Sequence, residues 1–476
     1  MLRSLLVLSV LVPGFFAALT NGYFGLLMYL WFALFRPQDW LWIDITSLRL
    51  SLVLGVIMVG RSLVSGILPN LTHPLCIGMV MMVASSVISQ TTAVRPDIGW
   101  VWIDFLFRLA LSCTMVVSLA GDARRLYGVL AVIGLSLGFH ASKAGLAFIL
   151  TGGGTRFDEG LSGSFVDNNG YALGTVMILP MLLVSAQNLE VLYTGRFLAW
   201  VRRGLYLMLP LCAFTVIGTY SRGGFLAFSA AILTFIMLQK RRFSALAGVV
   251  AFLALFLAVV PIPQRYYDRL STIKTYNQQT DEDPEGAKES AQSRPHFWRV
   301  GVIMAMAQPL GVGLKQYEAA YDRFDFTHGR YGHKRAVHSS HFQVLAELGF
   351  FATFLWIGLF TYAYFACFRV RARSRDERLS PRMQRFLLTA ANGLMTSMSG
   401  FIVGGSFISL AYNDLTWLTF GMVAALDVIS MRLMEQPDAE PVAAIEAEVP
   451  LAFRAVPSYA PTYAGQPFSA ANLRRP

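Results

Sequence analysis

Histidine is unevenly distributed in this chain. Of its seven histidines, five lie within residues 264–341, a polar stretch of 78 residues between two apolar runs. His338 and His341 stand three residues apart at the end of that stretch, which would place them on one face of a helix. Such a pair can ligate a metal, but no third ligand stands at a characteristic spacing, so we expect no metal site. Because imidazole titrates near neutral pH, a role as general base suits this histidine pair better.

Arg222 is a second residue that could take part in binding or catalysis. It stands in Thr219-Tyr220-Ser221-Arg222-Gly223-Gly224, at the junction of two apolar runs, where a guanidinium is costly unless it has a partner. One interpretation is an arginine that extends to the lipid headgroups. The other is an anion site, in which the arginine offers a fork of donors to phosphate and the glycines allow close backbone approach. The residues alone leave both open.

The stretch 264–341 also carries opposite charges in nearly equal number. Its eleven Lys and Arg residues face nine Asp and Glu residues, so a solvated folded loop is an alternative to a functional one. The run Asp281-Glu282-Asp283 is similar to the D-x-D element with which some glycosyltransferases hold a metal and a nucleotide sugar. It stands among Gln, Thr, Pro and Gly, a composition that favours a solvated loop.

The rest of the chain consists mainly of apolar runs that must position these residues. Hydrophobic residues make up 55% of the sequence and charged residues only 14%, against about 25% in soluble domains. Runs that are apolar on every face predict membrane-spanning helices and exclude a β-barrel. We therefore predict an all-α polytopic membrane protein with about twelve transmembrane helices and a large, partly helical loop. Thirteen candidate runs lie near residues 4–19, 22–36, 48–62, 74–90, 101–119, 126–150, 171–187, 204–220, 223–239, 243–262, 343–368, 384–410 and 415–434.

The first run has an arginine before it and small residues near its end, as a signal peptide has, but the many runs that follow favour an uncleaved helix. Pro13, Asn21 and Arg49 interrupt the first three runs, so one of them could be re-entrant or merged with its neighbour. The four cysteines all lie inside apolar runs without metal-ligand spacing, which indicates packing residues.

Basic residues in the short connectors predict the orientation. The connector 369–385 holds seven arginines and should be cytoplasmic. Counting along the chain puts the basic connectors at 124–125, 202–203 and 240–242 on the same side, so the net charge of +11 indicates topology and not nucleic-acid binding. Residues 152–170, 221–224, 264–341 and 411–414 then share the outer side. A membrane domain over 1–435 would be followed by a disordered cytoplasmic tail over 436–476.

Four segments together resemble the O-antigen ligase and polymerase superfamily of bacterial membrane glycosyltransferases. The resemblance covers roughly residues 150–435, and the first 150 residues look more like the exosortase-associated O-glycosylation ligases of the same superfamily. The segments are Arg156 to Tyr171, with Asp167-Asn168-Asn169; Ser221 to Ala227, with its Ser-Arg-Gly turn; Trp298 to Tyr317, with Pro309-Leu310-Gly311-Val312-Gly313-Leu314; and His338 to Gly349, a His-x(n)-Leu-x-Glu-x-Gly segment.

The resemblance implies an O-antigen ligase of lipopolysaccharide biosynthesis in the bacterial inner membrane. Such an enzyme transfers a glycan from an undecaprenyl pyrophosphate carrier to the lipid A-core oligosaccharide, at the periplasmic face, with inversion and without metal or other cofactor. Arginines can stabilise a diphosphate leaving group in place of a metal. The expected residues are His338, Arg222 and Arg265 for catalysis and Arg156, Asn168, Asn169, Tyr220, Arg294 and His341 for substrate binding.

Three other functions compete with this one. An O-antigen polymerase and a protein O-oligosaccharyltransferase would use the same lipid-linked donor, so the sequence separates them poorly from a ligase. A flippase or transporter should show charges within several spans and twofold internal similarity. The runs here are mostly free of charge and we find no internal repeat, which disfavours a transporter.

Overall fold

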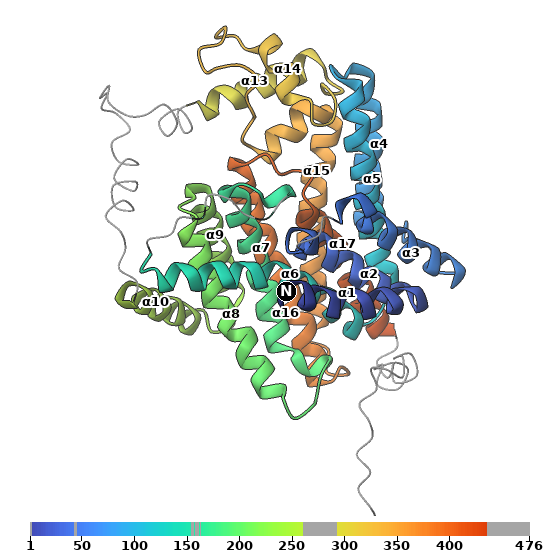
Figure 1. Cartoon of the computed structure of the whole chain (residues 1–476), viewed down its shortest axis with the longest axis vertical. Coiled ribbons are helices and arrows are strands. Elements are labelled where there is room, and N and C mark those ends of the chain that lie inside the picture. The colour runs from blue at the N-terminus through green and yellow to red at the C-terminus, as the bar shows by residue number, and fades with distance from the viewer. Residues whose placement is uncertain are drawn as a thin grey trace, which may run out of the picture. The chain divides into compact units, whose positions relative to one another are not determined.

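The computed structural model describes residues 2–41, 45–153, 157, 161, 163–259 and 293–435. Over these residues the regular elements are α-helices and short 3-10 turns (Figure 1). Within the described residues, each of the thirteen predicted apolar runs corresponds to one helix. Arg156, Arg265, the acidic run Asp281–Asp283 and the predicted tail 436–476 lie outside the described residues.

Nine of the described helices are long and apolar enough to cross a membrane. Four more are apolar but only 14 to 18 residues long, below the roughly 20 residues of a straight crossing. An all-α polytopic membrane protein is thereby confirmed. The nine are α1 (Leu2–Thr20), α4 (Pro74–Ser89, which a 3-10 turn continues to Thr92), α5 (Pro96–Leu119), α6 (Ala123–Leu150), α7 (Asn168–Gln187), α8 (Leu198–Gly218), α15 (Ser340–Arg373), α16 (Pro381–Gly404) and α17 (Asp414–Glu435); the four are α2 (Gly22–Phe35), α3 (Leu50–Val64), α9 (Arg222–Leu238) and α10 (Arg242–Val259).

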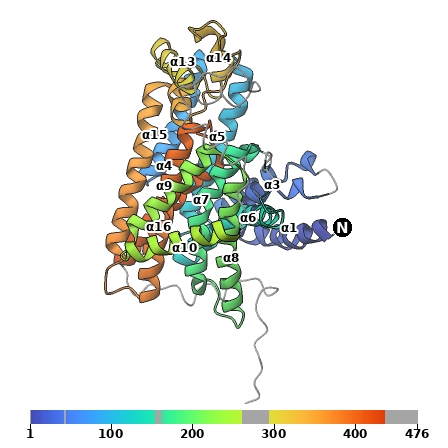
Figure 2. The same ribbon diagram turned by 90° about the vertical axis from the view of Figure 1, so that its left-hand side faces the viewer.

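The helices α7 and α16 form the centre of the bundle (Figure 2). Between them they contact α6, α8, α9, α15 and α17. Small residues on α16 make this packing close: a Cβ atom on Gly400 or Gly404 would lie within 3 Å of the side chain of Val176 or Leu173 on α7. Such residues let helix backbones approach in a membrane, where packing rather than water drives association. The first turn of α9, which begins with Arg222, is thereby held against α7 and α16.

Basic connectors meet at one end of the bundle. Glu190, in the α7–α8 connector, forms ion pairs with Arg202 on α8 and with Arg385 on α16. Lys240, in the α9–α10 connector, lines the same cavity as Arg385. These contacts bring together the connectors that the distribution of basic residues predicted on one side of the membrane.

The opposite end carries two further helices, α13 (Arg294–Ala307) and α14 (Tyr317–Phe324), which lie over the start of α15 (Figure 1). They share a small apolar core of their own, with Phe297, Val300 and Tyr321 fully buried. The predicted polar loop is therefore partly helical within residues 293–341.

The helix α15 is broken at Gly349, where φ is +78°. The segment that follows α13 packs into this break, because the N–H groups of Val312 and Gly313 donate to the carbonyls of Ala346 and Glu347 at 2.9 and 3.1 Å. A Cβ atom on Gly349 would collide with the carbonyl of Pro309, so the close approach requires glycine. The third and fourth sequence motifs are thus two halves of one structural unit.

The carboxylate of Glu347 joins the two halves of that unit by hydrogen bonds. It accepts hydrogen bonds from the backbone N–H of Lys315 at 2.9 Å and of Tyr317 at 3.4 Å, while Gln343 donates to it from the preceding turn of α15. Glu347 is buried, and a buried carboxylate is stable only with such partners. The acid fixes the start of α14 relative to α15 and so sets the position of the loop that leads to His338.

Candidate active site

Four helices begin close to one another at the end of the bundle opposite the basic connectors. Asp167, Ser221 and Ser339 are the N-caps of α7, α9 and α15, and α13 begins at Arg294. Their first turns leave N–H groups without helical partners and carry partial positive charge. Helix N-termini that converge in this way favour an anion between them.

Phe407, in the turn after α16, joins these helix ends. A Cβ atom on Gly223 in the first turn of α9 would lie 3.3 Å from the Cβ of Phe407. On another side, the guanidinium of Arg294 lies 5.7 Å from the centre of the Phe407 ring. Arg222 and Arg294, 72 residues apart in sequence, are therefore brought to one place.

Among the residues that the structure describes, no acidic side chain forms an ion pair with either arginine. Neither Arg222 nor Arg294 forms an ion pair or side-chain hydrogen bond within the described part of the chain, and the buried Nε of Arg294 has no acceptor there. Burial, and then the positive charge of Arg222, lower the pKa of the Arg294 guanidinium. Two like charges placed together without a counterion favour the binding of an anion, and a guanidinium fork matches phosphate oxygens.

His338 lies beside Arg294 but not in a helix. Its φ is +49°, and it precedes Ser339, the residue that caps α15. Its ring lies 6.0 Å from the ring of Phe297. Desolvation and then the charges of Arg294 and Arg335 lower the pKa of His338, against an opposing effect of Asp167. The imidazole is therefore neutral near pH 7 and able to accept a proton.

The prediction that His338 and His341 share one helix face is wrong, because only His341 belongs to α15. Both ring nitrogens of His341 contact protein groups: Nδ1 accepts from the indole N–H of Trp356 at 3.1 Å, and Nε2 lies 3.0 Å from the carbonyl of Ile402. This arrangement requires the proton on Nε2. For His341 to bind substrate, one of these bonds would have to break.

Three further predicted residues contact or belong to the turn before α9: Asn168 and Asn169 at the start of α7, and Tyr220 in the turn itself. The Asn168 side chain donates to the carbonyl of Thr219 at 3.2 Å, and Asn169 accepts from the Ser221 hydroxyl at 2.6 Å. The Tyr220 hydroxyl donates to the carbonyl of Gly153 at 3.1 Å. In this structure the three residues hold the turn that carries Arg222, while their contact with a substrate stays a prediction.

Sequence reasoning did not select Arg335. Its guanidinium lies 6.0 Å from the ring of Phe297, the same ring that His338 contacts, and its charge acts on His338. The run His333-Lys334-Arg335 has the appearance of a solvated basic segment. The sequence feature that could have identified Arg335 is its position three residues before His338.

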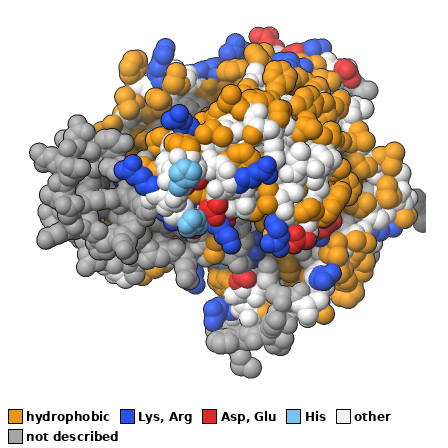
Figure 3. Space-filling view, turned by 90° about the horizontal axis from the view of Figure 1, so that it is seen from above, with side chains coloured by type: hydrophobic (Ala, Val, Ile, Leu, Met, Phe, Trp, Pro, Cys, Tyr) orange, Lys and Arg blue, Asp and Glu red, His pale blue; other side chains and the backbone are white. Residues whose placement is uncertain are grey.

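Figure 3 looks onto the end of the molecule that carries α13 and α14. Histidine and basic side chains gather on one part of this face, with apolar areas beside them. Among the residues that the structure describes, no group of three or more His, Cys, Asp or Glu side chains is placed to hold a metal ion. Near the candidate site, the charged side chains of the described residues are mainly basic.

The fold and site define the class: a helical polytopic membrane protein with basic side chains gathered where several helix N-termini meet. Within that class, a family model described as O-antigen ligase matches residues 207–357. This match supports the O-antigen ligase superfamily that the four motifs resemble, and the members of this family are glycosyltransferase-like ligases and polymerases. The matched segment contains Arg222, Arg294 and His338. No curated protein matches the chain.

Proposed function

We propose that this protein is an O-antigen ligase that transfers a glycan from undecaprenyl pyrophosphate to the lipid A-core oligosaccharide at the periplasmic face of the inner membrane. The observation that carries the proposal is the pair Arg222 and Arg294, two guanidiniums beside His338 that form no ion pair within the described part of the chain. A diphosphate supplies the negative charge that this arrangement lacks. The family match supports a ligase or polymerase, and the choice of donor and acceptor belongs to the proposal.

The arginines act on the leaving group. As the bond between the anomeric carbon and the diphosphate oxygen breaks, negative charge grows on the diphosphate, and preorganised guanidiniums stabilise it most strongly at that point. The converging N-termini of α7 and α9 add partial positive charge in the same place. Arg265 and Arg156 are proposed as further diphosphate ligands on the sequence resemblance alone.

His338 acts on the acceptor. An acceptor hydroxyl oxygen attacks the anomeric carbon on the face opposite the diphosphate, so the configuration inverts. The bond to the diphosphate breaks and its electron pair leaves with the carrier, while the hydroxyl proton passes to the neutral imidazole of His338 and then to water. Bond formation and bond breaking balance between donor and acceptor, without an oxidant or a reductant.

Deleting the gene and separating the surface polysaccharides on a gel tests the acceptor. A ligase predicts loss of long chains attached to the lipid A-core and accumulation of carrier-linked polymer, both reversed by the wild-type gene. Accumulation of single carrier-linked repeats would instead identify a polymerase. Normal lipopolysaccharide with loss of a glycosylated protein would identify a protein O-oligosaccharyltransferase.

A chelator should not abolish transfer by the purified protein. Because arginines can supply the charge stabilisation for which many glycosyltransferases use a divalent cation, we expect activity to persist in EDTA. The double variant Asp281→Ala with Asp283→Ala should transfer glycan at nearly the wild-type rate, since a metal-independent enzyme does not need a D-x-D element to hold a cation. Loss of activity in EDTA that Mg²⁺ or Mn²⁺ restores would refute metal independence.

A further inference from the structure

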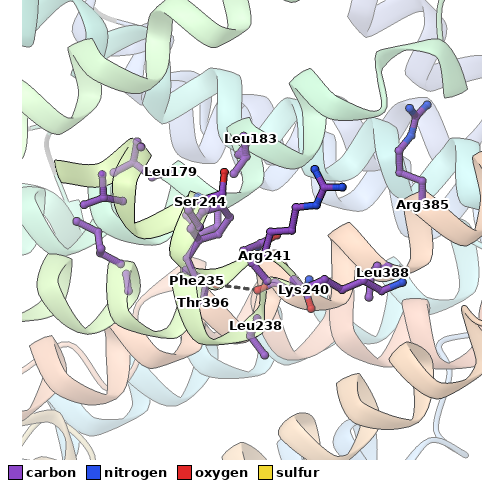
Figure 4. A pocket seen from close by; sticks show the side chains of 18 of the residues that line it. Leu179, Leu183, Phe235, Leu238, Lys240, Arg241, Ser244, Arg385, Leu388 and Thr396 are labelled. Carbon is purple, nitrogen blue, oxygen red and sulfur yellow. Dashed lines mark hydrogen bonds between the residues drawn. The ribbon is translucent and has the colours of Figure 1, made fainter. Parts of the chain in front are cut away.

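A large cavity lies away from the candidate active site, between α7, α8, α9, α10 and α16 (Figure 4). Its volume is about 1290 Å³, above the range of about 300–1,000 Å³ usual for small-molecule pockets. Pro180 and Pro210 interrupt α7 and α8 where they line it, and proline removes a helical hydrogen bond and bends a helix. A Cβ atom on Gly248 of α10 would meet nothing within 4 Å. A larger side chain at this lining position therefore has room among the described residues.

The lining changes from apolar to basic along the cavity. Figure 4 shows Leu179, Leu183 and Phe235 toward one side of the pocket, and Lys240, Arg241 and Arg385 toward the other. Arg371 and Arg375 also line it, and Glu377 is the one acidic residue among the lining residues. The structure therefore presents an apolar chamber with several cations at its rim.

Most of these cations are available to a ligand. Arg385 pairs with Glu190, and Arg371 donates to Asn392. Lys240, Arg241 and Arg375 form no ion pair or hydrogen bond through their side chains within the described residues. A ligand that fits must therefore combine a long apolar part with an anionic head.

The rim belongs to the membrane face opposite Arg222. The helix α9 runs from Arg222 to Leu238, and at 1.5 Å per residue the distance from Arg222 to Lys240 is about 27 Å. That distance is close to the thickness of about 30 Å of a hydrocarbon core. A lipid whose headgroup occupies the candidate active site cannot also place that headgroup at the rim.

We propose that this cavity binds one molecule of an anionic glycerophospholipid from the leaflet at the basic end of the bundle. An acyl chain lies among Leu179, Phe235 and Leu388, and the phosphate contacts Lys240, Arg241 and Arg375. The isoprenoid tail of a lipid-linked donor would fill the apolar chamber, but it has no charge to place against these cations. The proposal is independent of the proposed transfer reaction.

Native mass spectrometry of the full-length protein released from detergent tests this inference. The probes are phosphatidylglycerol and phosphatidylcholine with identical acyl chains. We expect wild-type protein to retain phosphatidylglycerol about tenfold better than phosphatidylcholine, because each basic side chain near an anionic lipid adds attraction. The triple variant Lys240→Gln, Arg241→Gln, Arg375→Gln should lose that preference. A control with the same charge change, Arg196→Gln, Arg203→Gln, Arg382→Gln, alters exposed residues that do not line the cavity and should keep it.

A second pair of variants tests the chamber itself. Gly248→Trp should fill the cavity and reduce retention of both lipids, whereas Gly204→Trp on α8, also in open space but outside the cavity, should not. Equal phosphatidylglycerol retention by the two triple variants would overturn the proposal, as would equal retention of the two lipids by wild type. Displacement of bound phosphatidylglycerol by an undecaprenyl diphosphate sugar would assign the cavity to the donor instead. Because no glycan transfer is measured, failure here leaves the proposed function intact.

Discussion

Replacing Arg222 with lysine should reduce glycan transfer by roughly 10- to 150-fold although the positive charge remains. Lysine offers a point charge where arginine offers a planar fork, so at least one charge-assisted hydrogen bond to the diphosphate is lost, worth about 1.5–3 kcal/mol. Arg294 cannot replace it, because the two guanidiniums approach the site from different helices, α9 and α13. The measurement is transfer from a lipid-linked donor by purified, correctly inserted variants.

The matched control is Arg323→Lys, which changes an exposed arginine on α14 that stacks on its neighbour Phe324. It should leave transfer and donor binding unchanged. Wild-type transfer by Arg222→Lys would mean that Arg222 supplies charge alone, or that it only extends to the lipid headgroups. Either result would remove the two-pronged contact from the mechanism.

The helical architecture was predictable because lipid leaves few alternatives. A run that is apolar on every face and about 20 residues long must satisfy its backbone internally, which only a helix or a closed barrel does. One boundary error has an identifiable cause. Sequence reasoning ended the run 343–368 before the arginines, yet α15 continues to Arg373, because Arg369 and Arg373 bind the buried carboxylate of Asp427 on α17 at 2.5 and 2.6 Å. The sequence does not display such a distant partner.

In the candidate site, too, some features could be predicted from the sequence and others could not. Arg222 could be selected from the sequence because an arginine between two apolar runs is energetically costly, and such a residue is usually functional. The position of His338 depends on Ser339, whose hydroxyl accepts from the N–H of Phe342 and starts the helix there. A serine before an apolar run is a common helix N-cap, so the wrong prediction that His338 lies in the helix was avoidable. The role of Glu347 was not readable, since its backbone partners lie about 30 residues earlier in the chain.

Replacing His338 with alanine should separate donor binding from transfer. A lost general base reduces turnover by something like 10²- to 10⁴-fold, whereas binding of the lipid-linked donor should change little because Arg222 and Arg294 remain. The pH profile gives a second measure. Since the pKa of His338 is lowered, wild-type transfer should remain constant as the pH falls through about 6.5, the ordinary histidine value, and decline only below it. That acidic decline should disappear in the small residual activity of His338→Ala.

The comparison for this variant is His333→Ala, five residues earlier in the same loop. His333 is 75% exposed and lies 3.3 Å from Asp322, so its removal should leave turnover, donor binding and the acidic decline as in wild type. Both variants are measured for donor binding and transfer at several pH values, after insertion at the wild-type level has been established. If His338→Ala loses donor binding as completely as it loses transfer, the histidine belongs to the diphosphate site together with Arg294, and the acceptor hydroxyl is activated by another group. If transfer by His338→Ala instead keeps the wild-type rate and pH profile, the ring has no part in proton transfer.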